Sequence, residues 1–343
     1  MATDAKKEPI LTIGMANHDD YSGVWFTIQT IRFYHHEIID DVEFLLLDNS
    51  PLTKHGETNR NYITKTLGSK GHYLSVSARK STSLRNMVID AANTEYVMCL
   101  DSHVLLQPGS LAKLIKFLKL SQGCPDIFHG PLMHENSSIV GTHMNPAFRG
   151  RNFGTWGVMP DVNCADPKTE PFLIPGHGMG LWVCRRDNWQ RFHHAYRAFG
   201  GEELIIHEKY RQAGYNCWCL PFLGWQHRFG HVGGASYPNT DPEKYRNFLI
   251  GFHETGLPLE EVESYFSTLV PEGRRNQIKA DVAKIFPDGP KKLPPGYKPF
   301  LGYPLRINDI SRQDSQDYRE FEKPIYSVPA DRVPDAHVQP APA

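Results

Sequence analysis

The sequence lacks the features that would tie it to a membrane or to the secretory pathway. Its 343 residues contain no continuous apolar stretch of the roughly 18–20 residues that a membrane span requires. The first ten residues, MATDAKKEPI, have no apolar segment of the kind found in a signal peptide. We therefore expect a soluble, cytoplasmic protein.

The sequence also has no excess of basic or acidic residues, and none of its cysteines are spaced as a CxxC pair. The chain has 37 basic and 38 acidic residues, for a formal net charge of −1. Proteins that bind nucleic acid through its phosphates usually carry a basic excess or stripe, so charge gives nucleic-acid binding no support, although a nucleic acid is not excluded as a substrate. The six cysteines form no CxxC pair, which favours reduced thiols over a disulfide framework.

Alternating apolar and amphipathic segments predict an α/β fold. Strands are expected over residues 10–15, 42–47, 96–100, 181–184 and 217–220, and helices over 24–33, 82–92, 110–120, 202–212, 243–255 and 259–269. This order is typical of a mainly parallel sheet with helices on both faces. We expect one domain over residues 1–255, a C-terminal helical extension over 256–290, and a Pro-rich, partly disordered tail over 291–343.

Two stretches have no periodic pattern and are expected to be irregular. Residues 129–180 are rich in Gly, Pro, His and Asn. A long irregular stretch inside a domain is more often a lid or binding loop than a linker. Residues 224–231, GWQHRFGH, are likewise expected to form a loop.

Polar clusters follow three of the predicted strands, at residues 17–20, 48–50 and 101–103. In sheets of this kind, ligands bind beyond the carboxyl ends of the strands. We therefore expect the three clusters to converge on one crevice.

The most informative cluster is Asp101-Ser102-His103, which ends the apolar run of residues 96–100. Side chains at positions i and i+2 of a strand project to one face, so Asp101 and His103 could reach one ion. A carboxylate with an imidazole suits Mn²⁺ or Zn²⁺, and Mg²⁺ less well. Taken alone, the same short motif is more typical of a surface turn at a strand end.

Other candidate residues also have both a structural and a functional interpretation. Asp48 precedes Asn-Ser-Pro, which favours an Asx turn, although its carboxylate could accept from a base or ribose. Glu202 and Glu203 open a helix whose dipole stabilises them, or they supply a catalytic carboxylate. His227 and His231 are more typical of surface loop residues unless partners lie nearby.

Four segments, taken in order, carry a resemblance to a known family. Residues 93–111, NTEYVMCLDSHVLLQPGSL, resemble the metal-binding segment of family 2-type glycosyltransferases of the GT-A fold, and the D-x-H variant is similar to the polypeptide N-acetylgalactosaminyltransferases. GHGMGLW (176–182) resembles the donor-side strand of that family, and FGGEEL (199–204) its W-G-G-E-N-L segment. PFLGWQHRF (221–229) resembles the stretch that ends in the last metal-ligand histidine. The resemblance covers roughly residues 9–255.

The resemblance implies a GT-A (Rossmann-like) fold and a metal site. Asp101, His103 and His227 would bind a divalent cation, expected to be Mn²⁺, with coordination positions left for the diphosphate of a nucleotide-sugar. Such a cation neutralises the charge that develops on the leaving group. Two imidazoles in place of carboxylates favour Mn²⁺ over Mg²⁺. Because the imidazoles must be neutral to bind the cation, activity should fall in acid.

The resemblance also implies contacts to the donor and acceptor. Asp48 would contact the uracil or ribose, Arg79 would approach the nucleotide, and the backbone near Gly180 would lie by the sugar. Glu202 would face the sugar or the acceptor. Glu202 or Glu203 could act as the base of an inverting transfer, but the resembled family retains configuration, so we expect retention.

A loop over the pyrophosphate is implied to contain Arg228, His231 and Tyr237. Two residues depart from the family pattern. Phe199 stands where the family has Trp, and Gly230 stands near the place of a pyrophosphate-contacting Arg. Arg228 or His231 would have to substitute for that Arg.

The expected activity is therefore metal-dependent transfer of a hexose or N-acetylhexosamine from a nucleotide-sugar, expected to be UDP-linked, to a hydroxyl group. The acceptor could be a protein, a glycan, a metabolite or a hydroxylated base in DNA, and side chains within residues 129–160 are expected to select it. One alternative is a catalytically silent GT-A module used for binding or as a scaffold. Another is a metal-dependent hydrolase built on the same His-rich crevice.

Overall fold

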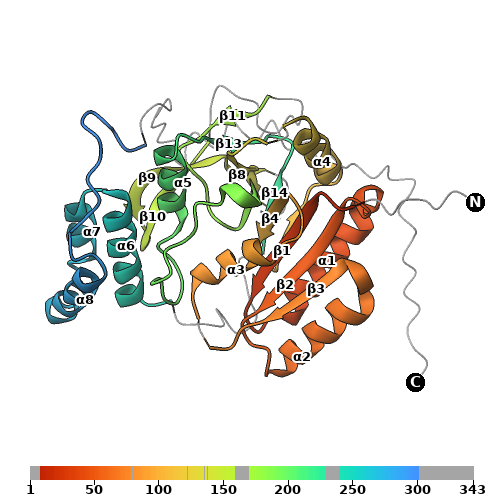
Figure 1. Cartoon of the computed structure of the whole chain (residues 1–343), viewed down its shortest axis with the longest axis horizontal. Helices are drawn as coiled ribbons and strands as arrows, with labels where there is room; N and C mark the ends of the chain where they lie inside the picture. Colours follow the sequence, from red (N-terminus) through yellow and green to blue (C-terminus); the bar gives the residue numbers. More distant parts are fainter. Residues whose placement is uncertain are drawn as a thin grey trace, which may run out of the picture.

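An eight-stranded mixed sheet forms the centre of the protein (Figure 1). The computed structural model describes residues 8–78, 80–121, 123–134, 136, 138–158, 170–228 and 239–300. The strand order is β11-β13-β6-β12-β4-β1-β2-β3. In chain order these strands are β1 (Leu11–Asn17), β2 (Val42–Asp48), β3 (Gly71–Ser75), β4 (Tyr96–Leu100), β6 (Ile127–His129), β11 (Phe172–Leu173), β12 (Leu181–Arg185) and β13 (Cys217–Cys219).

The central part of this sheet is parallel, as the sequence predicts. β4, β1, β2 and β3 run in one direction, and β13 runs parallel to β6. β12 lies antiparallel between β4 and β6, and β11 is antiparallel to β13. The predicted α/β class with a mainly parallel sheet is therefore confirmed.

Two smaller sheets, apart from their strand at residues 104–106, occupy segments for which we expected irregular structure. One contains β5 (Val104–Leu106), β14 (Trp225–His227), β7 (Leu132–Met133) and β8 (Ile139–Gly141), and the other pairs β9 (His143–Arg149) with β10 (Asn152–Gly157). The prediction of a loop over residues 224–231 is wrong for 225–227, and residues 129–180 contain several strands. Most of these strands are two or three residues long, too short to leave a periodic pattern in the sequence.

Helices cover both faces of the central sheet (Figure 1). They are α1 (Tyr21–Tyr34), α2 (Lys54–Asn61), α3 (Arg85–Ala91), α4 (Ser110–Leu120), α5 (Glu203–Gln212), α6 (Asp241–Thr255), α7 (Leu259–Phe266) and α8 (Glu272–Ile285). The helix predicted over residues 82–92 is a 3₁₀ turn, Thr82–Leu84, followed by α3. The sequence did not predict α2 or α8, because α2 is almost wholly polar and α8 buries only Ile278 and Val282.

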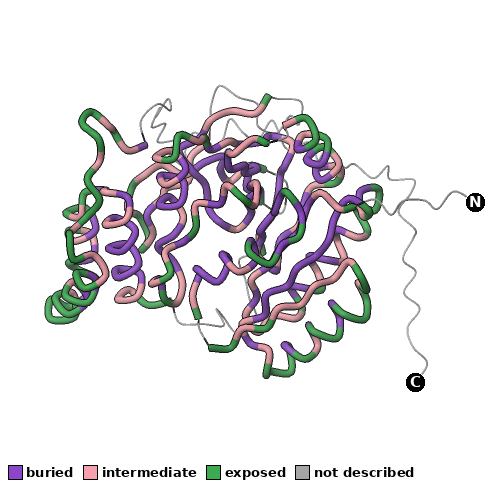
Figure 2. The backbone as a smooth tube through the Cα atoms, viewed as in Figure 1, coloured by how far each residue is buried: buried purple, intermediate pink, exposed green. Residues whose placement is uncertain are grey.

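Successive side chains of the inner strands enter two separate hydrophobic clusters, one on each face of the sheet. Leu11, Ile13 and Met15 of β1 join the cluster that includes α1 and α4. Val97 and Cys99 of β4 join the cluster that includes α3, α5 and α6. The strands are therefore buried on both faces, as Figure 2 shows along β1, β2 and β4. This explains their continuous apolar runs.

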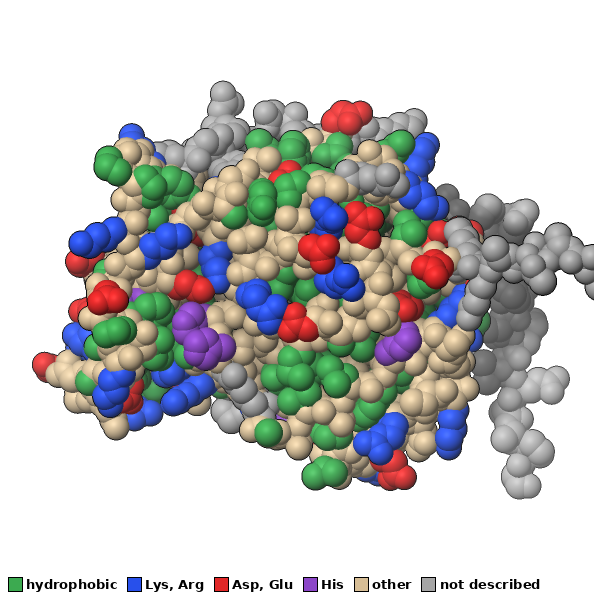
Figure 3. Space-filling model, in the orientation of Figure 1, with side chains coloured by type: hydrophobic (Ala, Val, Ile, Leu, Met, Phe, Trp, Pro, Cys, Tyr) green, Lys and Arg blue, Asp and Glu red, His purple; other side chains and the backbone are tan. Residues whose placement is uncertain are grey.

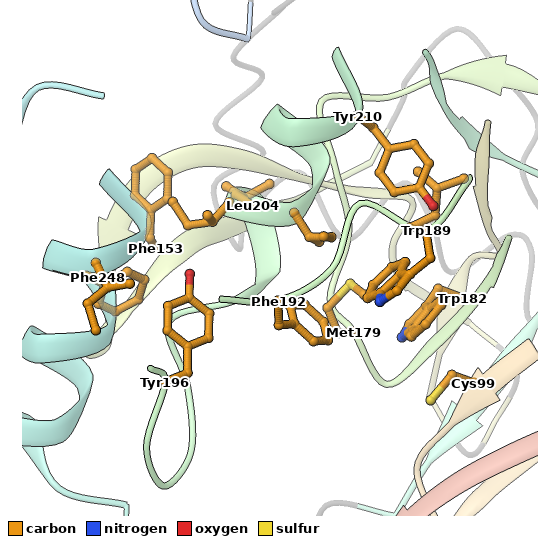
Figure 4. Close-up of a cluster of buried hydrophobic side chains, with 14 of the residues drawn as sticks. Cys99, Phe153, Met179, Trp182, Trp189, Phe192, Tyr196, Leu204, Tyr210 and Phe248 are labelled. Carbon is orange, nitrogen blue, oxygen red and sulfur yellow. The ribbon is translucent and has the colours of Figure 1, made fainter. Parts of the chain in front are cut away.

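The second cluster is rich in aromatic rings (Figure 4). Trp182 of β12 stacks on Trp189, with ring centroids 4.4 Å apart and planes 8° from parallel. Trp189 also meets Phe192 edge-on at 5.0 Å, and its indole N–H donates to Asn86. These contacts join β12 to the segment that follows it and to α3.

The C-terminal helices form a group at the end of the molecule away from β3 (Figure 1). α6 packs against α5, α7 and α8. The chain then returns along α5, where the Tyr297 hydroxyl donates to Glu208 Oε1 (2.7 Å) and the Phe300 amide donates to Glu208 Oε2 (3.3 Å). Residues 291–300 thus belong to the packed structure.

The distribution of charged side chains on the surface and the state of the cysteines agree with what the composition indicates. On the face shown in Figure 3, basic and acidic side chains are interspersed. The five cysteines among the described residues carry free thiols, as expected, and Cys164 lies outside these residues. Within the described ranges, none of the helices combines the length and the apolar character needed to cross a bilayer.

We predict that Trp182→Ala lowers the free energy of unfolding by about 3–5 kcal/mol, because a fully buried indole and its stack on Trp189 are lost. Denaturant unfolding followed by circular dichroism measures the change. Trp25→Ala is the matched control, since Trp25 is 45% exposed and should change stability far less. Equal effects of the two substitutions would contradict this packing.

Candidate functional site

The three polar clusters predicted from the sequence lie together at one edge of the central sheet. Strands β2, β1 and β4 are adjacent and parallel, so their carboxyl ends meet there. Asn17 and Asp48 are register partners, and Asp101 follows the last residue of β4. The Asp19 amide donates to Ser50 Oγ (2.6 Å), which links the first two clusters. The three clusters are therefore neighbours, as expected, although of the three only the first two contribute residues to the lining of the pocket described below.

Asp101, His103 and His227 come together through strand pairing rather than through strand alternation. β4 ends at Leu100, and Asp101 and His103 flank a turn before β5 begins, so our expectation that both lie on one strand face is wrong. β14 pairs antiparallel with β5, and His227 is the register partner of Val104. This pairing brings His227 beside His103 although 124 positions separate them.

The three side chains present one donor atom each to a common point. His227 Nε2 lies 3.2 Å from Asp101 Oδ2 and 3.0 Å from His103 Nε2. All three donor atoms lie within 4.8 Å of one another, and in the described part of the chain this is the one such group of three or more His, Cys, Asp or Glu residues. One carboxylate oxygen and two imidazole nitrogens form a donor set that suits Mn²⁺ or Zn²⁺. The residues therefore fit a divalent cation.

Asp20 supports this group from α1. Its Oδ2 lies 3.6 Å from His103 Nδ1, and a carboxylate behind a histidine is the usual support of a metal ligand. Asp20 Oδ1 also caps α1 by accepting from the Gly23 amide (2.8 Å). Burial raises the pKa of Asp20, but the hydrogen bonds with His103 and Gly23 outweigh it and hold the pKa well below its usual range. Asp20 is thus an anion at neutral pH.

Arg85, the first residue of α3, joins Asp101 to a buried carboxylate. One guanidinium nitrogen donates to Asp101 Oδ1 (2.9 Å) and the other to Glu202 Oε1 (3.2 Å). Burial raises the pKa of Asp101, but His227 and Arg85 outweigh it and hold the pKa well below its usual range. Burial and the charge of Glu203 raise the pKa of Glu202, against the influence of Arg85. The two carboxylates that share Arg85 therefore differ in how readily they accept a proton.

A glycine turn and one buried amide hold Glu202 in place. Gly200 and Gly201 have φ values of +91° and +93°, which other residues rarely adopt. The Asn247 amide group donates to Gly200 O (2.8 Å) and to Arg197 O (2.7 Å), and its oxygen accepts from the Arg197 amide (3.0 Å). α6 thereby fixes the turn that leads into α5.

Gly180 gives β14 a close approach to β12. A Cβ on Gly180 would lie 2.7 Å from the indole of Trp225 and 3.5 Å from Asp101 Oδ2. The Gly180 carbonyl accepts from the Asp101 amide (3.0 Å). Only a residue without a side chain lets Trp225, two residues before His227, pack here.

A pocket of about 50 Å³ opens beside this group at the ends of β1 and β2. Its lining includes Asn17, Asn49, Lys80, Ser81 and Arg85. Neither amide atom of Asn17 has a hydrogen-bond partner among the described residues, although both are buried.

Asp48 lies next to this pocket with both carboxylate oxygens engaged. Oδ1 accepts from the Ser50 amide (2.8 Å) and hydroxyl (3.1 Å), which is the geometry of an Asx turn. Oδ2 accepts from the Tyr73 hydroxyl (3.0 Å) and from Asn59 (3.5 Å). The structural interpretation of Asp48 therefore fits, and a nucleotide contact would have to share these oxygens.

Of the remaining predicted residues, Arg228 is described and three are not. The Arg228 amide donates to His103 O (3.2 Å), and its guanidinium lies 3.8 Å from Asp20 Oδ2. Arg79, His231 and Tyr237 lie outside the described residues.

Sequence reasoning missed Asp20 and Arg85. Asp20 belonged to a cluster that we had noted, and its place as the last polar residue before a helix was a usable capping signal. Arg85 had no such signal, because its partner Glu202 is 117 positions away.

No protein-family model matches the sequence, and no curated protein matches it. The fold is that of the GT-A glycosyltransferases, a mixed α/β architecture with a large, mainly parallel central sheet flanked by helices. One similar solved structure is GalNAc-T7 with UDP, GalNAc and Mn²⁺, at 16% identity and a TM-score of 0.61 over 81% of this chain. The match spans 56% of the GalNAc-T7 chain.

Two further structures are similar at lower scores. Residues 1–349 of S. aureus TarS have 9% identity and a TM-score of 0.45 over 80% of this chain and 73% of that chain. The mannosyltransferase PcManGT from Pyrobaculum calidifontis, in complex with GDP-Man and Mn²⁺, has 12% identity and a TM-score of 0.46 over 85% and 82%.

We predict that Arg85→Ala lowers the free energy of unfolding by roughly 3–5 kcal/mol at pH 9, because the buried Glu202 and the partly buried Asp101 lose their shared cation. The loss should be smaller at pH 5.5, where Glu202, with its raised pKa, is neutral and no longer needs a cation. Urea unfolding at the two pH values measures both effects.

Arg191→Ala is the control, because it breaks an ion pair with Asp90 in which both side chains are about half exposed. A loss for Arg85→Ala no larger than for this control would contradict the buried network.

Proposed function

We propose that the protein is a metal-dependent glycosyltransferase that moves a sugar from a nucleotide-sugar, with UDP as the nucleotide, to a hydroxyl acceptor. The observation that carries the proposal is the convergence of Asp101, His103 and His227 donor atoms within 4.8 Å, beside a pocket at the carboxyl ends of the strands in a GT-A fold. The likeness to polypeptide N-acetylgalactosaminyltransferases in the D-x-H, G-G-E and last-histidine motifs supports the choice of UDP and Mn²⁺.

In this proposal Asp101, His103 and His227 hold Mn²⁺. When bound, the cation neutralises the charge that develops on the leaving diphosphate. Asp20 orients His103 through the Nδ1 contact. Arg228, the next residue after His227, adds a positive charge on the same side.

The donor would lie across the ends of β1 and β2, with only part of it entering the pocket of about 50 Å³ there. We assign the nucleotide to the neighbourhood of Asp48 and Arg79, and the sugar to the backbone at Gly180. His231 and Tyr237, which lie outside the described residues, are assigned together with Arg228 as contacts of the pyrophosphate. Lys80, which lines the pocket, supplies cationic charge for an anionic ligand, whereas the charge of Arg85 is already shared by Asp101 and Glu202.

We propose that transfer retains the configuration at the anomeric carbon. An inverting enzyme needs a carboxylate that can take the proton of the acceptor hydroxyl. Glu202 is only 1% exposed and one of its oxygens is held by Arg85, which suits a positioning role better than that of a base. Glu203 is the next residue in the chain, and we assign it to the same side of the site as Glu202. The anomeric configuration of the glycoside product, read by proton NMR, distinguishes the two outcomes.

The acceptor hydroxyl belongs to a protein, a glycan, a metabolite or a hydroxylated DNA base, and side chains within residues 129–160 select it. We assign sugar transfer to residues 1–255, with 256–290 as a helical extension and 291–343 as a tail whose first ten residues pack against α5. A panel of nucleotide-sugars with Mn²⁺, scored by thermal shift, identifies the donor. Mass spectrometry of an extract offered as acceptor then identifies the product.

Two results of these experiments would overturn the proposal. Absence of UDP binding with and without Mn²⁺, and of binding by every nucleotide-sugar in the panel, would favour a silent scaffold. Release of free sugar with no acceptor ever glycosylated would favour a hydrolase.

We predict that Asp101→Ala and His227→Ala each reduce transfer at least about 100-fold, because each removes one of three ligands. Far-UV circular dichroism should stay unchanged. His194→Ala, at an exposed histidine, is the control and should retain activity. Full activity of either ligand variant in saturating Mn²⁺ would remove the metal assignment.

We also predict that Mn²⁺ binds at least about tenfold more weakly at pH 5.5 than at pH 8, because protons compete for the imidazole nitrogens of His103 and His227. Isothermal titration of the protein with Mn²⁺ at the two pH values measures this change. The same affinity at both values would mean that the imidazoles do not coordinate.

A further inference from the structure

A second group of histidines lies in the core behind the candidate site. His129 is the last residue of β6, His207 is on α5, and His177 precedes β12; each has 0% exposure. The ring of His129 stacks on that of His177 at 5.1 Å and meets that of His207 at 4.8 Å. None of these residues has a role in the proposed transfer.

His129 and His207 form a chain of three short polar contacts. His207 Nδ1 lies 2.5 Å from Glu203 O, and His129 Nδ1 lies 3.0 Å from Leu181 O. The two Nε2 atoms face each other at 2.8 Å. Backbone carbonyl oxygens can only accept, so each Nδ1 must carry a proton, and the Nε2 contact needs a third. Two neutral imidazoles hold only two ring protons between them.

The position of the third proton follows from a further contact. The backbone amide of His177 donates to His207 Nε2 (3.3 Å), so that nitrogen is an acceptor. The proton between the rings therefore belongs to His129. We propose that His129 and His207 form a buried proton-binding pair, with His129 as the imidazolium and His207 as its neutral Nδ1–H partner. The charge-assisted contacts tie together β6, α5 and the start of β12.

Burial acts against this charge. It is the main cause that lowers the pKa of His207 to about 3, which agrees with a neutral His207. Burial, together with the neighbouring His207 and His177, lowers the pKa of His129 well below its usual value, against the hydrogen bond to Leu181. A neutral pair, however, would leave two acceptors in contact inside the core, either at Leu181 O or between the Nε2 atoms. The contacts therefore set the proton count.

The other titratable groups around the pair supply no competing proton to these contacts. His177 Nδ1 is directed to Gly178 O (3.2 Å), with His143 beyond it. On α5, Arg211 is paired with Glu208 (2.9 Å) and the carboxyl of Glu203 is buried. On β13, Cys217 and Cys219 are buried thiols, and Cys217 Sγ lies 3.8 Å from His207 O.

Each histidine of the pair contacts the carbonyl of a residue that directly follows a residue of the candidate site. Leu181 follows Gly180, whose carbonyl accepts from the Asp101 amide. Glu203 follows Glu202, whose carboxylate is held by Arg85. His129 and His207 are thus positioning residues, because they hold the segments that carry these groups without reaching the pocket.

Nitrogen-15 NMR of the whole protein, labelled at histidine and free of donor and metal, tests the proton count. At pH 8 we expect one histidine with two ring N–H protons that exchange slowly because they are buried, and this signal should vanish in His129→Gln. Signals of only neutral rings would overturn the proposal. So would one metal ion per chain in the protein as purified, measured by elemental analysis before the metal is removed, that is absent from His129→Gln. Neither result depends on sugar transfer, so this test and that of the proposed function fail separately.

The pH dependence of unfolding gives a second readout. Between pH 7 and 9 the native pair would hold three ring protons, whereas two unfolded histidines, with pKa near 6.5, hold about two. The folding equilibrium constant of the wild type should therefore fall about tenfold per pH unit relative to His129→Gln. A neutral pair would give no such difference in this window, which would overturn the proposal.

His253→Gln is the matched control. His253 Nδ1 also contacts the carbonyl four residues earlier on its helix, Leu249 O (2.7 Å), but its ring meets Phe286 rather than a second imidazole. This variant should keep the wild-type slope. If His129→Gln does not fold, the NMR measurement on the wild type still decides the proton count.

Discussion

The antiparallel pairing of β14 with β5 brings the last of the three donor residues to the other two. Without it, Asp101 and His103 would be two polar residues at a strand end. The pairing depends in turn on Gly180, because a side chain there would displace Trp225 and with it the strand that carries His227. Backbone hydrogen bonds and one missing Cβ therefore set the positions of the donor atoms: His227 lies on β14, and Asp101 and His103 lie in the short turn between β4 and β5.

Charge within the site is balanced by groups from distant parts of the chain. Asp20 and Asp101 remain ionised, one beside His103 and the other beside Arg85. Arg85 also reaches Glu202, so α3 joins the end of β4 to the start of α5. A cation added at the three donor atoms would meet two nearby carboxylates and one guanidinium that already has partners.

The parts of the fold that were predictable are those with long or strongly patterned segments. β1, β2, β4 and α4 were expected within a residue or two, because strands buried on both faces and an amphipathic helix leave clear patterns. The strands β7, β8 and β14 are too short for a pattern and exist only through pairing. For the site, chain order was enough to select Asp101, His103 and His227. The contact of Arg85 with Glu202 and that of His129 with His207 depend on tertiary packing, which no local pattern encodes.

The docking of residues 291–300 on α5 sets a limit on where the chain can be shortened. Glu208 is fully buried, and it accepts from Tyr297 and Phe300 as well as from Arg211. The ring of Phe300 also covers the Arg211 guanidinium at 4.6 Å. A chain cut before Tyr297 would open this ion pair to solvent on the helix that also carries His207. Residues 291–300 therefore cover Glu208 and Arg211 on α5, and the first turn of the same helix faces the candidate site.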